Sequence, residues 1–163
     1  CGAIGLLLVQ AAVSRRIRVL AHDIYEEKLE KAARLGAETS PDADPAQLWR
    51  AARVAAIFEC AGTPQAVARA LDAAPRGSKV ILLGLSSAPA SFSPLRLVRE
   101  GISIIPSLIY DHPADFENAL KLVAGGVLTP SAIVDHTYEF RSIAGAFEQA
   151  VTGRTGKIHV VFP

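Results

Sequence analysis

The stretch CGAIGLLLVQ, residues 1–10, decides the fold because it places two glycines three positions apart at the start of a helix-forming run. Gly2 and Gly5 have the spacing of the last two glycines in G-x-G-x-x-G, the turn that seats a dinucleotide pyrophosphate. In that motif the middle glycine lets the backbone approach the anion. The last glycine lets the helix pack closely on its strand, and the helix N-terminus faces the phosphates. Glycines also punctuate many other strand-to-helix turns, so the motif needs support from the rest of the chain.

A carboxylate in the expected place supplies that support. The motif calls for an acid about 20 residues further on, where it accepts hydrogen bonds from the ribose hydroxyls. Asp23 directly follows the short apolar run IRVLAH, residues 17–22. It is alternatively a turn or helix-cap residue. An acid there repels a 2′-phosphate, so the pattern favours NAD over NADP. Lys28 either reaches the adenine ribose or lies on a solvated helix face.

The composition bounds the class of protein. The chain has 163 residues, of which 50% are hydrophobic and 20% charged, as expected for one domain with a sizeable core. The net charge of +1 includes no basic stripe, which argues against nucleic acid or an acidic membrane as partner. No apolar run approaches the roughly 20 residues that span a bilayer. Two cysteines, Cys1 and Cys60, do not form a disulfide framework, so we expect a cytoplasmic protein.

Short apolar runs alternate with helical segments along the whole chain, and this alternation predicts an α/β doubly wound fold with a mostly parallel sheet. Because proline cannot donate to a β ladder, Pro106 indicates that its strand lies at a sheet edge or changes role there. The predicted strands are 17–23, 54–62, 75–85, 102–110, 132–140 and 157–163, with 54–62 buried on both faces. The predicted helices are 3–14, 25–38, one from Pro45 with Asp44 as its cap, 63–74, 112–126 and 142–151.

Six segments in order resemble the medium-chain dehydrogenase family, the zinc-containing alcohol and polyol dehydrogenases. The opening CGAIGLLLVQAA is similar to that family's glycine turn without its first glycine, and FECAG (58–62) is similar to its fourth strand. The other segments that carry the resemblance are VLAHDIYEEKLEKAARLGA (19–37), RGSKVILLGL (76–85), ISIIPSLIY (102–110), and 115–150 followed by GKIHVVFP (156–163).

The resemblance implies that residues 1–163 are the NAD-binding Rossmann domain of a dehydrogenase that moves a hydride between nicotinamide and an alcohol carbon. It places the catalytic zinc in a separate GroES-like domain, which the return segment of about 127–163 would contact. It implies no catalytic residue and no metal ligand in this chain. The positions that it assigns to the cofactor, together with those of the glycine turn, are Gly2, Ala3, Ile4, Gly5, Asp23, Lys28, Gly62, Leu83, Gly84, Leu85, Ser107, Leu108 and Ile109.

Two rival functions stay open. One is a zinc-free quinone or enoyl reductase of the same superfamily, although such enzymes favour NADPH and usually lack an acid at the position of Asp23. The other is a regulatory domain that senses NAD without chemistry. For the dehydrogenase, the expected partners are a small alcohol or carbonyl substrate and a second copy of the chain, joined through the apolar strand 102–110.

The strand order of such folds yields one further expectation. In the order 3-2-1-4-5-6 the first strand lies between the second and the fourth. The sequence holds no strand before the glycine turn and no methionine, so we expect that strand, and the zinc-bearing domain, to precede Cys1. The strands at 17–22 and 54–60 should then not be hydrogen-bonded neighbours.

Overall fold

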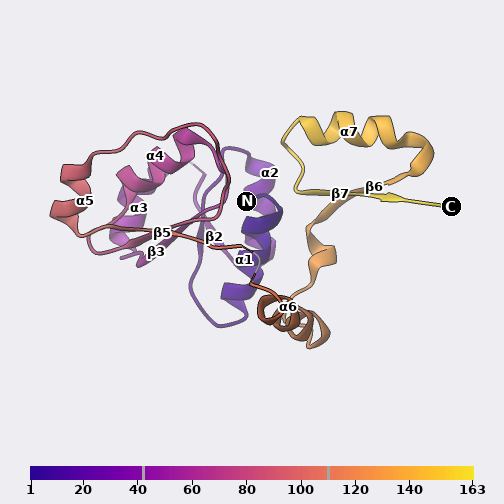
Figure 1. Cartoon of the computed structure of the whole chain (residues 1–163), viewed down its shortest axis with the longest axis horizontal. Coiled ribbons are helices and arrows are strands. Elements are labelled where there is room, and N and C mark those ends of the chain that lie inside the picture. Colours follow the sequence, from indigo (N-terminus) through magenta and orange to yellow (C-terminus); the bar gives the residue numbers. More distant parts are fainter. Residues whose placement is uncertain (42, 110) are drawn as a thin grey trace. The chain divides into compact units, whose positions relative to one another are not determined.

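The computed structural model describes residues 1–41, 43–109 and 111–163, and the chain divides into two compact units (Figure 1). Residues 1–41 together with 111–163 form the first unit, and 43–109 form the second. All strand pairs between described residues are parallel, and strands alternate with helices. The α/β Rossmann-like fold that the sequence predicts is confirmed.

The first unit is built around the helix that follows the glycine turn. Its core joins Leu6 and Val9 of that helix to Ala32, Ala37 and Ile133. These buried residues come from both the N-terminal and the C-terminal parts of the chain, so the C-terminal segment shares a core with the helix that follows the glycine turn. The elements are α1 (Ala3–Val13), β1 (Leu20–Ala21), α2 (Glu26–Arg34), β2 (Glu38–Thr39), α6 (Ala114–Ala124), η1 (Pro130–Ile133), β6 (Val134–Glu139), η2 (Phe140–Ser142), α7 (Ile143–Val151) and β7 (Lys157–Val161). β1 pairs with β2 and β6 with β7, and α7 runs beside the β6–β7 pair (Figure 1).

The second unit is a three-stranded sheet in the order β3-β4-β5 with helices packed on it. Its elements are α3 (Pro45–Ala51), β3 (Ala56–Glu59), α4 (Pro64–Ala73), β4 (Lys79–Leu82), α5 (Pro94–Glu100) and β5 (Ser103–Pro106). Each of the three helices starts with a cap residue followed by proline. The side chain of the cap accepts a hydrogen bond from an amide group that the helix itself leaves free. The core consists of Ile57, Ala70, Leu71, Ala74, Val80 and Ile102.

The strand pairing agrees with the sequence at two points and corrects it at others. β1 and β3 belong to separate sheets, and β5 ends its sheet as Pro106 predicts. The expectation that strand 54–62 is buried on both faces is wrong, because Phe58 in β3 is 47% exposed. β2 and α5 were not predicted, and β1 keeps only two residues of the predicted strand 17–23.

Candidate cofactor site

The glycine turn forms the uncapped start of α1. Gly2 is the N-cap residue, and the first hydrogen bond of the helix runs from Leu6 N to Gly2 O at 2.9 Å. The amide groups of Ala3, Ile4 and Gly5 therefore have no partner within the helix, and no side chain caps them. A Cβ built on Gly2 would meet no atom within 4 Å. Free amide groups, a positive helix end and open space beside a glycine together suit an anion.

Asp23 lies beside this turn, as the sequence predicts. Its Oδ2 is 2.5 Å from Cys1 N, and its Oδ1 accepts a hydrogen bond from Tyr25 N at 3.1 Å. Its side chain is only 13% exposed. The turn interpretation of Asp23 is therefore visible, since its carboxylate accepts from Tyr25 N just before α2. Its role toward a ribose stays a prediction.

Lys28 is engaged by the C-terminal segment rather than free in solvent. Its Nζ donates to Gly153 O at 2.6 Å and lies 4.9 Å from the centre of the Tyr25 ring. The same loop reaches the start of α1, since a Cβ on Gly156 would lie 3.9 Å from Ala3 N. The loop between α7 and β7 therefore lines the glycine turn.

A buried ion pair holds that loop in place. The Lys31 ammonium donates to Asp135 Oδ1, and Asp135 Oδ2 accepts from Gly156 N. Burial alone would raise the pKa of Asp135, but the hydrogen bonds from Lys31, Gly156 and Lys157 outweigh it and lower the pKa. Asp135 therefore stays ionised and fixes the C-terminal loop to α2.

In the second unit, the turns that follow β3 and β4 touch each other. Gly62 has a left-handed backbone with φ of 66°, and a Cβ there would lie 2.7 Å from both Leu85 N and Leu85 O. A Cβ on Gly84 would lie 2.5 Å from Gly62 Cα. Only glycine fits at either position, so the backbones of the two turns pack directly against each other. Both turns lie at the carboxyl ends of parallel strands, where α/β sheets bind ligands.

Glu59 connects these two turns. Its backbone oxygen accepts from Leu83 N and Gly84 N, both at 2.9 Å. Its side-chain Oε1 accepts from Ala61 N at 2.7 Å and from Gly62 N at 3.0 Å. The amide groups of Leu83 and Gly84 are therefore used inside the protein, and a ligand at this turn would meet other backbone atoms.

The segment after β5 is exposed. Ser107 N donates to Leu82 O at 3.0 Å and so continues the pairing with β4. Leu108 is 89% and Ile109 52% exposed, and their side chains are open to a ligand or to another chain. The structure thus gathers the predicted cofactor residues in two groups, one in each unit: the glycine turn with Asp23, and the ends of β3, β4 and β5.

Comparison with known proteins identifies the family. The family model described as zinc-binding dehydrogenase matches residues 3–125. The chain belongs to the zinc-binding dehydrogenase family. It is 30% identical over 130 residues to an alcohol dehydrogenase of Geobacillus stearothermophilus, covering 77% of this chain and 38% of that protein.

Solved structures agree with this zinc-binding dehydrogenase fold. The alcohol dehydrogenase TADH from Thermus sp. ATN1 superposes with a TM-score of 0.88 at 24% identity, over 99% of this chain and 50% of that one. An alcohol dehydrogenase from Escherichia coli CFT073, described as complexed with NADH, gives a TM-score of 0.81 at 22% identity, over 98% and 49%. The chain spans half or less of the length of these relatives.

The described part of this zinc-binding dehydrogenase chain contains no cluster of three or more His, Cys, Asp or Glu side chains able to hold a metal ion. Cys60 is half-buried and its Sγ lies 3.8 Å from Phe58 O, and burial raises the pKa of its thiol. None of the described helices is long and apolar enough to cross a membrane.

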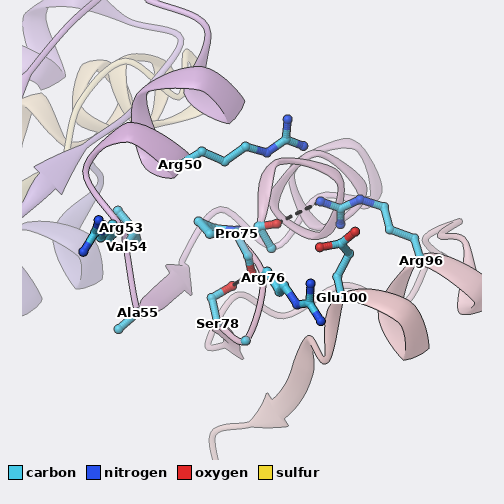
Figure 2. Close-up of a pocket in the computed structure, with 11 residues that line it drawn as sticks. Arg50, Arg53, Val54, Ala55, Pro75, Arg76, Ser78, Arg96 and Glu100 are labelled. Atoms are coloured by element: carbon cyan, nitrogen blue, oxygen red, sulfur yellow. Dashed lines mark hydrogen bonds between the residues drawn. The ribbon is translucent and has the colours of Figure 1, made fainter.

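A cavity of about 670 Å³ lies at the other edge of the β3-β4-β5 sheet, near the starts of β3 and β4. Figure 2 shows Arg50, Arg76, Arg96 and Glu100 around it. The Arg96 guanidinium donates to Leu71 O and, at 2.8 Å, to Ala74 O. These carbonyls end α4 and have no partner within the helix, so Arg96 stabilises the helix end. The cavity is remote in the sheet from the turns that contain Gly62 and Gly84.

The residue that the sequence did not single out is Glu59. It lies inside the motif FECAG, where an acid within an apolar run is unusual, because a buried carboxylate needs hydrogen-bond donors. The acid within this apolar run was the sequence feature that could have pointed to Glu59. The amide groups that satisfy the carboxylate belong to the next turn of the chain, and the turn after β4 becomes its neighbour only in the folded sheet.

Proposed function

We propose that this chain forms the cofactor-binding half of an NAD-dependent alcohol or polyol dehydrogenase. When bound, the nicotinamide cofactor would carry the hydride to or from an alcohol carbon. The zinc that polarises the substrate oxygen would be held by another part of the protein. The residues of this chain would bind and orient the cofactor.

The observation that carries this proposal is the position of Asp23 beside the free amide groups at the start of α1. The turn suits a pyrophosphate, and Cys1, immediately before it, lies against the residue that precedes Asp23, with Cys1 Sγ 3.8 Å from His22 O. A dinucleotide seated on the helix end would bring its adenosine ribose to such a carboxylate. The family match and the relative described as an NADH complex support the same proposal.

The test is a titration of NADH and NADPH into the full-length gene product and its Asp23→Ser variant. We expect the unmodified protein to bind NADH more tightly, since Asp23 accepts ribose hydrogen bonds and repels a 2′-phosphate. The variant should lose about tenfold or more in NADH affinity, the size of a lost hydrogen bond to a charged group, while NADPH gains relative to NADH. Equal binding of NADH and NADPH by the unmodified protein would show that Asp23 does not distinguish a ribose with free hydroxyls from one with a 2′-phosphate.

We also propose that two copies associate through β5 and the residues after it. Ile104 and Ile105 are 36% and 38% exposed on an edge strand, and Leu108 beyond it is 89% exposed. Position 110, the end of the predicted strand, lies outside the described residues. Exposed apolar edges are usually covered, and pairing with a second copy would cover this one. A cytoplasmic location remains part of the proposal.

A further inference from the structure

The Glu59 side chain is buried at the carboxyl edge of the β3-β4-β5 sheet, with 5% of the residue exposed. Through its main-chain oxygen it holds two amide groups of the turn after β4, and through Oε1 it holds two of the turn after β3. Four backbone donors from two turns therefore converge on one residue. The remaining oxygen, Oε2, is buried with no hydrogen-bond partner among the described residues.

The unpartnered oxygen faces the Gly84 backbone. A Cβ built on Gly84 would lie 2.7 Å from Glu59 Oε2. The carboxylate thus fills the space that a side chain at position 84 would occupy, and it blocks sideways movement of the turn after β4. Two hydrogen bonds to the single oxygen Oε1, from Ala61 N at 2.7 Å and Gly62 N at 3.0 Å, hold the turn after β3 in place.

We propose that Glu59 is a positioning residue for the nicotinamide half of the cofactor, acting through the turns that contain Gly62 and Gly84. This inference rests on the proposed function. Glu59 does not contact the cofactor itself, because both of its oxygens are enclosed by the protein. It fixes the backbone surface at the carboxyl edge, whereas the proposed function assigns the ADP-ribose half to the start of α1 and Asp23.

The division between the two halves provides the test. NADH and ADP-ribose are titrated separately into the full-length gene product and into the variants Glu59→Ala and Glu59→Gln. We expect Glu59→Ala to weaken NADH binding by about tenfold, the effect of losing the hydrogen bonds that hold the turn, with ADP-ribose affinity unchanged within twofold. Glu59→Gln keeps the Oε1 acceptor and should restore most of the NADH affinity.

Glu100→Gln is the matched control, since it changes an acid in the same unit at the opposite edge of the sheet and should alter neither affinity. Equal weakening of NADH and ADP-ribose by Glu59→Ala would indicate a general structural role and overturn the inference. Unchanged affinity for both ligands would overturn it too. If Glu59→Ala does not fold, Glu59→Met takes its place, because it keeps the length of the side chain but has no oxygen to accept from Ala61 N and Gly62 N. A selective loss of NADH affinity in Glu59→Met supports the inference, and unchanged NADH affinity overturns it. A wild-type protein that binds neither ligand would refute the proposed function and, with it, the inference.

Discussion

Replacing Gly84 with alanine tests the direct packing of the two turns. The new Cβ would lie 2.5 Å from Gly62 Cα and 2.7 Å from Glu59 Oε2, and closer still to Gly62 N. Real Cβ atoms stay at least 3.0 Å from such neighbours, so the backbone must move by half an ångström or more. Neither obstacle yields easily, because Gly62 is backbone and Glu59 Oε1 is hydrogen-bonded to Ala61 N and Gly62 N.

Overpacking of this kind costs roughly 1–3 kcal/mol, and the rigid neighbours place Gly84→Ala near the upper end. For a chain of this size, a loss of about 3 kcal/mol lowers the midpoint of thermal unfolding by about 6–12 °C. Circular dichroism during heating and urea unfolding measure the two quantities.

Gly145→Ala is the control for this measurement. Gly145 lies inside α7, and a Cβ there would meet Tyr138 Cε1 at an ordinary 3.8 Å. Alanine should therefore stabilise the helix by about 0.5–1 kcal/mol. A Gly84→Ala protein within about 0.5 kcal/mol of wild type would show that the turns after β3 and β4 do not pack as described.

Three further changes test other parts of the structure. Arg96→Met should destabilise the chain by about 1–2 kcal/mol in urea unfolding, because it leaves the carbonyls of Leu71 and Ala74 without a donor; an unchanged midpoint would contradict this role. Asp135→Asn should lower the free energy of unfolding near neutral pH. The lowered pKa of Asp135 means that its stabilisation is present above the ordinary value of 3.8 and is lost as the pH falls through the folded value, so the difference between variant and wild type should shrink in acid. A pH-independent difference would exclude the ionised carboxylate as its cause. Ile105→Lys should convert a dimer into a monomer in light scattering, and a wild-type monomer at micromolar concentration would refute association through β5.

Features set by neighbouring residues could be predicted from the sequence. Asp44 before Pro45 and Thr63 before Pro64 mark helix starts, because the cap oxygen and the amide that it accepts lie within three residues. α5 has the same pattern, with Ser93 before Pro94, but the small residues that precede it give the segment the composition of a loop. The cap and the proline alone would have predicted the start of α5, but the loop-like composition before them favoured the wrong interpretation.

Features made by distant parts of the chain could not be predicted. β2 has two residues, too few to show a period, and it exists because Glu38 N donates to Val19 O at 2.8 Å and its residues pair with β1. Lys28 has a partner, Gly153 O, that is 125 positions away in the sequence. Neither the secondary-structure propensity of these residues nor their spacing in the sequence indicates which distant residue they will contact.

Asp23 and Glu59 show how this chain uses its acids at the candidate site. Each carboxylate accepts hydrogen bonds from main-chain nitrogen atoms two or three residues further along the chain. An acid whose oxygen atoms are used in this way shapes a backbone surface, so it is poorly placed to exchange protons with a substrate. The turn at Gly2 adds open space and free amide groups, and the turns at Gly62 and Gly84 add closely packed backbone. Under the proposed function, these turns therefore orient the cofactor, and the groups that transfer the alcohol proton must be supplied from outside them.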